Sequence, residues 1–65
     1  MIKVRDVIAL IDYPDDVQVI IYDFGKMDTI FRGLGEDVLS YYLDDEVKGL
    51  EFPSKNELMI NINHE

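Results

Sequence analysis

The chain of 65 residues contains no cysteine and no tryptophan, only two prolines and four glycines, and a single histidine. Without cysteine it can form neither a disulfide nor a thiolate metal site, which is typical of proteins of a reducing cytoplasm. Nor does any apolar run approach the roughly 18 residues that a membrane-spanning helix needs. These absences predict a soluble, cytoplasmic protein that forms one small domain over residues 1–65.

Basic residues are also scarce, because six Lys and Arg stand against 14 Asp and Glu and leave a formal net charge of −8. The six are scattered singly along the chain, whereas nucleic acids and anionic membrane surfaces require clusters of them. We therefore expect no direct nucleic-acid binding and no membrane binding. Two interpretations of the acidic excess stay open. It is either a solvated face that keeps a small apolar protein in solution, or an acidic surface that docks on a basic partner by imitating phosphates.

Residue types that carry catalysis or bind metals are few and poorly placed. His64 lies next to the C-terminus, where chains are usually mobile, so it is predicted to lack the fixed partner that a catalytic base needs. Ser40 and Ser54 lack the flanking glycines of a nucleophile elbow. The acidic residues at 12–16 and 44–46 do not have the spacing of a calcium loop. The sequence therefore predicts no enzyme, no metal site and no cofactor.

The longest apolar run, residues 17–24, predicts the central strand of a sheet, because β-branched and aromatic residues between turn formers favour a strand over a helix. Alternate side chains of a strand point to opposite faces. One face would carry Val17, Val19 and Ile21, and the other Ile20, Tyr22 and Phe24. Gly25, which can take a positive φ, would open a hairpin loop, and residues 29–32 would return as the paired strand.

The remaining patterns complete an α+β layout in the order αββαββ. A first helix with apolar residues at Val4, Val7, Ile8 and Ile11 would end near Asp12 or Tyr13, before Pro14. A second helix would begin at residues 36–37 and include Leu43, a third strand would cover residues 46–52, and an alternating fourth strand residues 57–63. We predict a four-stranded antiparallel sheet with both helices packed on one face. Similar acidic and apolar clusters recur 31 residues apart, either by chance or through a duplicated αββ unit.

Two helices cover only one face of such a sheet, so the other face of the central strand would remain exposed. Tyrosine and methionine are enriched at protein interfaces. The predicted interface residues are Ile20, Tyr22, Phe24, Tyr41 and Met59. A second copy of the chain is the simplest cover, which predicts a homodimer, and a foreign protein with a basic surface is the competing partner.

Five segments that together cover most of the chain carry a resemblance: IKVRDVI at 2–8, VIIYD at 19–23, IFRG at 30–33, YLDDEV at 42–47 and NELMINI at 56–62. They resemble small uncharacterised accessory proteins encoded by phages and mobile elements of Gram-positive bacteria. The resemblance implies a non-catalytic accessory protein, and inhibitors of host defence are common among small acidic phage proteins.

We therefore expect a small acidic protein that acts by protein binding, with an inhibitor of a host protein as its most specific form. Two alternatives come from other classes of protein. One is an oligomer that sequesters a small molecule or nucleotide, and the other is a self-associating structural protein.

Overall fold

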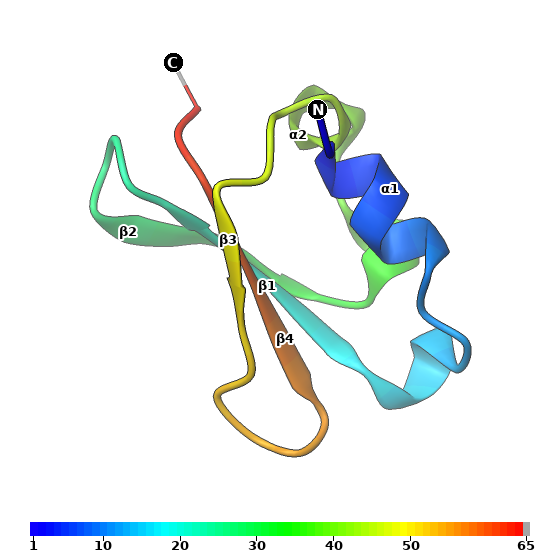
Figure 1. The fold of residues 1–65 in the computed structure, drawn as a ribbon. Coiled ribbons are helices and arrows are strands. Elements are labelled where there is room, and N and C mark those ends of the chain that lie inside the picture. Colours follow the sequence, from blue (N-terminus) through cyan, green and yellow to red (C-terminus); the bar gives the residue numbers. More distant parts are fainter. Residues whose placement is uncertain (65) are drawn as a thin grey trace.

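The computed structural model describes residues 1–64 and contains a four-stranded sheet and two short α-helices, an α+β arrangement (Figure 1). With 3₁₀ turns written as η, the elements are α1 (Val4–Ala9), η1 (Pro14–Asp16), β1 (Gln18–Asp23), β2 (Asp28–Gly33), η2 (Gly35–Asp37), α2 (Ser40–Leu43), β3 (Gly49–Glu51) and β4 (Glu57–Ile62). The predicted order αββαββ is confirmed. Within residues 1–64 no helix is long and apolar enough to cross a membrane.

The strands lie in the order β2-β1-β4-β3, so β1 and β4 form the centre of the sheet. β1 pairs antiparallel with β2, and β3 antiparallel with β4, but β1 and β4 run parallel. The prediction of a fully antiparallel sheet is therefore wrong, and the sheet is mixed. The alternation of apolar residues is the same in either direction along a strand. It therefore does not predict whether the two hairpins pair parallel or antiparallel. The pairing also joins the first strand of one αββ unit to the second strand of the other, which is not the symmetric contact of two duplicated units.

The first hairpin agrees closely with its prediction. Its register runs from Val19 opposite Gly33 to Asp23 opposite Asp28, with a β-bulge beside Ile21. The loop differs in detail, because the positive φ of 54° belongs to Met27 and not to Gly25. The Gly25 amide donates instead to Asp23 Oδ1 at 2.8 Å, so a side-chain turn starts the loop.

Helix α1 is shorter than predicted. It starts at Val4, where the Lys3 amide donates to Asp6 Oδ2 at 2.9 Å in a capping box. It ends at Ala9 and not near residues 12–13, because the last turn tightens into bonds between residues three apart, such as the one from the Leu10 amide to the Val7 carbonyl at 3.1 Å. Because the helix ends at Ala9, Leu10 is its C-cap residue.

The second half of the chain is also less regular than predicted. Val38 and Leu39 have extended backbones, with ψ of 128° and 139°, and they split the expected helix into η2 and the four-residue α2. The third strand shrinks to three residues because the segment before it pairs elsewhere. Lys3 bridges Glu46, and the Val47 amide donates to the Ile2 carbonyl at 2.9 Å. The N-terminus is thereby fixed beside β3.

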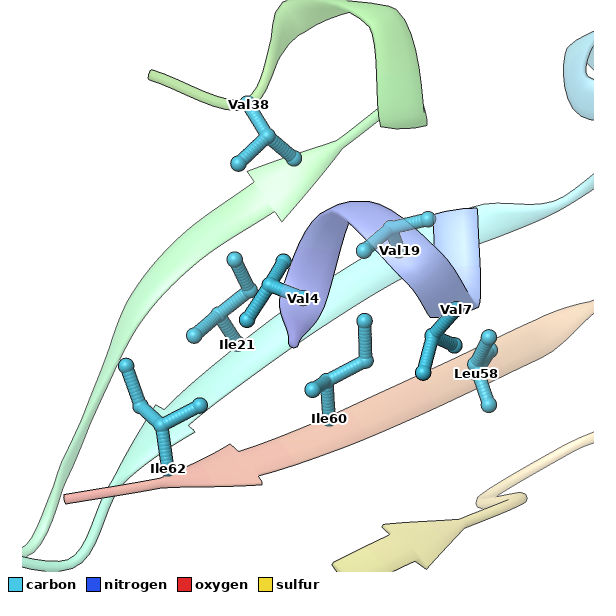
Figure 2. Close-up of a cluster of buried hydrophobic side chains, with 8 residues drawn as sticks. All are labelled: Val4, Val7, Val19, Ile21, Val38, Leu58, Ile60 and Ile62. Carbon is cyan, nitrogen blue, oxygen red and sulfur yellow. The ribbon is translucent and has the colours of Figure 1, made fainter. Parts of the chain in front are cut away.

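One face of the sheet carries the core (Figure 2). Its buried members are Val4, Val7, Val19, Ile21, Val38, Leu58, Ile60 and Ile62. α1 supplies Val4 and Val7 and lies over β1 and β4 (Figure 2), whereas α2 contributes only partly buried side chains. Gly35 allows η2 to approach α1, since a Cβ there would lie 2.9 Å from Ile8 Cγ2. The helix layer is therefore complete over the sheet centre.

Candidate functional site: an apolar groove between α1 and β3

A groove of about 490 Å³ opens between α1 and β3. We call it the α1–β3 groove, and its lining residues are Ile2, Val7, Leu10, Ile11, Val47, Lys48, Gly49, Leu50, Phe52 and Leu58. Four of them are large apolar residues that remain exposed: Ile2, Leu10, Leu50 and Phe52. Isolated exposed apolar side chains are ordinary, but a gathering of this kind around one hollow is typical of a binding surface.

Each exposed residue reaches the groove from a different part of the chain. Leu10, 81% exposed, caps the C-terminal end of α1. Leu50 lies directly opposite Ile60 in the β3–β4 pair, so it shares the core side of the sheet. Phe52, 73% exposed, follows the last residue of β3, and Ile2 is positioned by its bond to Val47.

The groove is continuous with the core. Val7 and Leu58 line the groove and also belong to the buried cluster, so they form its floor. Among residues 1–64 no side chain fills the space above Leu50, which is 45% exposed although it points to the core side of the sheet. The groove is therefore an end of the hydrophobic layer that stays uncovered over the edge strand.

Lys48 is the one charged side chain among the groove-lining residues within 1–64. Its Nζ lies 2.7 Å from Glu46 Oε1. The hydrogen bond from Lys48, together with its positive charge, lowers the pKa of the Glu46 carboxyl below its ordinary value of 4.5. Because the ammonium is paired, the groove presents no free positive charge to a ligand.

The predicted interface residues lie elsewhere. Ile20, Tyr22 and Met59 are on the opposite face of the sheet, as the pairing of Ile20 with Met59 shows. The rings of Tyr22 and Phe24 meet edge to face with centroids 5.4 Å apart. Ile20 is only 1% exposed, so neighbouring side chains of the same chain already cover it. Tyr41 stands apart from these four, on α2.

Polar contacts edge this opposite face. Arg32 Nη1 donates to Gln18 Oε1 at 3.2 Å and to Glu57 Oε2 at 3.3 Å. Asn61 Nδ2 donates to Glu51 Oε2 at 3.0 Å across the β3–β4 pair. The face therefore combines a small aromatic pair with a hydrogen-bonded polar surface.

His64 is fixed in the structure, contrary to the prediction of a mobile side chain without partners. Its Nδ1 lies 2.6 Å from Asp45 Oδ2, and its side chain is only 11% exposed. The ring packs against Tyr41 and Tyr42 with centroid distances of 4.4 and 5.2 Å. The prediction of a mobile His64 rested only on its nearness to the chain end. In the structure, β4 holds the residues just before His64 in the centre of the sheet.

The His64 amide continues this cluster by donating to Asp23 Oδ1 at 3.1 Å. Asp23 is fully buried, and its Oδ2, like His64 Nε2, has no hydrogen-bond partner in the described part of the chain. No group of three His, Cys, Asp or Glu side chains among residues 1–64 is arranged to hold a metal ion. The cluster therefore ties the end of β4 to α2 and β1.

The sequence did not predict Leu10, Leu50 and Phe52 as binding residues. The available signal was the pair of large apolar residues on either side of Glu51, in a segment predicted as a regular strand.

Comparison of the chain with protein-family models, with curated proteins and with solved structures gave no match.

Proposed function

We propose that this chain is a small, acidic, non-catalytic accessory protein that acts by binding another protein through the α1–β3 groove. The observation that carries the proposal is the gathering of Ile2, Leu10, Leu50 and Phe52, all exposed, around one hollow that opens into the core. The helix layer, which we place on one face of the sheet, ends before β3, and a partner would complete it. Burial of apolar surface then supplies the free energy of association.

The same geometry supports the inhibitor form of this proposal. A chain of 65 residues that offers one apolar groove can act on a larger protein by occupying its surface, without chemistry of its own. If the resemblance to small phage-encoded proteins extends to function, that larger protein would belong to a bacterial host. The net charge of −8 favours a target with a basic surface, because opposite charges steer the encounter.

A homodimer through the opposite face is the second proposal, and the exposed half of Phe24 beside Tyr22 supports it. The homodimer was predicted because the face that carries Ile20 was expected to be exposed. In the structure Ile20 is buried without a second copy. Light scattering at about 100 μM separates the proposals, because a dimer of micromolar affinity would be largely formed at that concentration. A dimeric mass that Phe24→Asp converts to a monomer would favour the homodimer.

The main test compares retention of proteins from a Gram-positive bacterial lysate on the immobilised wild type and two variants. Phe52→Asp places a charge at the groove, and Tyr13→Asp is its matched control, because both aromatic residues are 73% exposed and Tyr13 lies outside the groove. We expect the same retained protein on the wild type and on Tyr13→Asp, and its loss on Phe52→Asp. Equal retention on all three would overturn the assignment of the groove.

A further inference from the structure

The shape of the α1–β3 groove indicates what kind of element it receives. α1 lies over β1 and β4, and β3 is the next strand outward. Neighbouring strands are about 4.8 Å apart and packed helices about 8–10 Å apart, so a helix placed beside α1 would lie over β3. There it would contact Leu50 from above and Leu10 from the side. The uncovered space therefore has the position that a second helix beside α1 would take.

The charge of the chain selects the polar side of that helix. The exposed Asp6 and Asp12 are the sequence neighbours of the lining residues Val7 and Ile11. Lys48, the charged lining residue among those described, is paired with Glu46. Since the chain as a whole carries a formal net charge of −8, lysine or arginine on the polar side of an approaching helix would be attracted to it.

A second copy of the chain does not offer such a helix. The apolar side of α1 is occupied by its own core through Val4 and Val7, and α1 carries one basic residue, Arg5, and one acidic residue, Asp6. Each copy also has a formal charge of −8, so two copies repel one another at low salt. The charge pattern favours a foreign, basic segment.

We infer that the α1–β3 groove binds a basic amphipathic helix of a partner protein, with apolar residues spaced at i, i+3 or i+4, and i+7 on the side that enters the groove. This inference rests on the proposed function and specifies the class of partner. The apolar side of the helix would meet Leu10, Leu50 and Phe52, and the net negative charge of the chain would attract its lysines or arginines.

The test uses fluorescence anisotropy with a labelled peptide of about 14 residues, four helical turns, that combines an apolar leucine stripe with lysines. Three matched peptides accompany it: one with glutamate for lysine, one with the same composition in scrambled order, and one with a central proline. We expect the basic helical peptide to bind about tenfold or more tightly than each of the three, a difference of about 1.4 kcal/mol. Its affinity should fall as the salt concentration rises from about 50 to about 500 mM, since salt screens the charges.

Matched leucine variants locate the binding. Leu10→Ser removes a groove residue, and Leu39→Ser removes another exposed leucine that lies outside the groove. Both side chains are exposed, so both variants should keep the circular dichroism of the wild type. We expect Leu10→Ser to weaken binding of the basic peptide about tenfold and Leu39→Ser to leave it within about twofold.

Four results would overturn the inference. Equal binding of the scrambled peptide would show that charge alone acts, and equal binding of the proline peptide would point to strand addition at the edge of β3. Unchanged affinity in Leu10→Ser would place the site elsewhere. If Phe52→Asp loses its lysate partner while none of the peptides binds, the proposed function stands and the helical, basic partner is wrong.

Discussion

The same apolar layer is closed over the centre of the sheet and open over its edge. Over β1 and β4, Val4 and Val7 of α1 seal Ile21 and Ile60, which are completely buried. Over β3, Leu50 points to the same side of the sheet and stays 45% exposed. Both regions carry apolar side chains on the same side of the sheet. They differ in whether a helix lies above them.

The difference follows from how the chain distributes its helical residues. α1 has six residues and supplies two buried side chains, whereas α2 has four and supplies none. A chain of this size buries only about 60% of the surface of its unfolded state. The buried apolar side chains are concentrated over the centre of the sheet. The edge at β3 stays exposed, and we propose that the protein binds its partner there.

The largest effect is expected where the layer is closed. Ile21→Asp would place an unpaired carboxylate in a completely buried position, at a cost of several kcal/mol. Since the total stability of such a domain is on the order of 5 kcal/mol, the variant should be unfolded. Circular dichroism and thermal melting check this. Leu50→Asp, at the open end, is the control and should still melt cooperatively, so an intact Ile21→Asp would remove the distinction between the two regions.

A smaller loss is expected at the polar tie of the closed region. His64→Ala removes the contact with Asp45 and leaves a half-buried carboxylate without its partner, which should lower the free energy of unfolding by about 1–3 kcal/mol. Urea unfolding measures the loss, with the exposed neighbour Asn63→Ala as control. Binding of the basic peptide should not change, because His64 does not line the groove. Stability equal to the wild type would restore the prediction of a mobile histidine.

At the open end, polar substitution should change binding without changing stability. The double variant Leu50→Ser and Phe52→Ser alters two exposed side chains, so the free energy of unfolding should stay within about 1 kcal/mol of the wild type. An apolar dye such as ANS should bind the wild type and lose most of its fluorescence enhancement in the variant. A double variant that unfolds, or that keeps the full dye signal, would contradict an open groove.

The smallest effect is expected at the groove's own ion pair. The lowered pKa of Glu46 means that this carboxylate adds stability above its ordinary pKa of 4.5, and that the contribution is lost as the pH falls through the lowered value. Glu46→Gln should therefore be slightly less stable than the wild type near pH 6, and the difference should shrink as the pH falls toward 3, as urea midpoints at about these values would show. A larger difference at the lower pH would contradict the direction of the shift.

Local patterns predicted the parts of the fold that depend on neighbouring residues. The run around Ile21 gave the central strand and its hairpin, and the alternation of Leu58, Ile60 and Ile62 gave β4. The parallel joining of β1 to β4 is a long-range choice that alternation does not encode, although apolar residues on both faces of β1 are typical of a parallel strand. The apolar spacing around Val38 predicted a helix. Val38 is buried in the core, but its backbone is extended and not helical.

The candidate site was less predictable than the fold. Leu10 and Leu50 are 40 positions apart, and only the placement of α1 beside the sheet edge brings them to one groove. The predicted interface centred on Ile20 assumed that a sheet face without helices is exposed, whereas side chains on that face cover one another. The contact of His64 with Asp45 likewise depends on the tertiary structure and has no local signature.

The most direct test of the open groove is an NMR titration of the ¹⁵N-labelled protein with the basic helical peptide. We predict that the largest amide shifts fall on the residues of the α1–β3 groove, among them Leu10, Leu50 and Phe52, and that the amides of Tyr22 and Met59 on the opposite face barely shift. Shifts concentrated at Tyr22, Phe24 and Met59 would contradict the account and return the binding surface to the face predicted from the sequence.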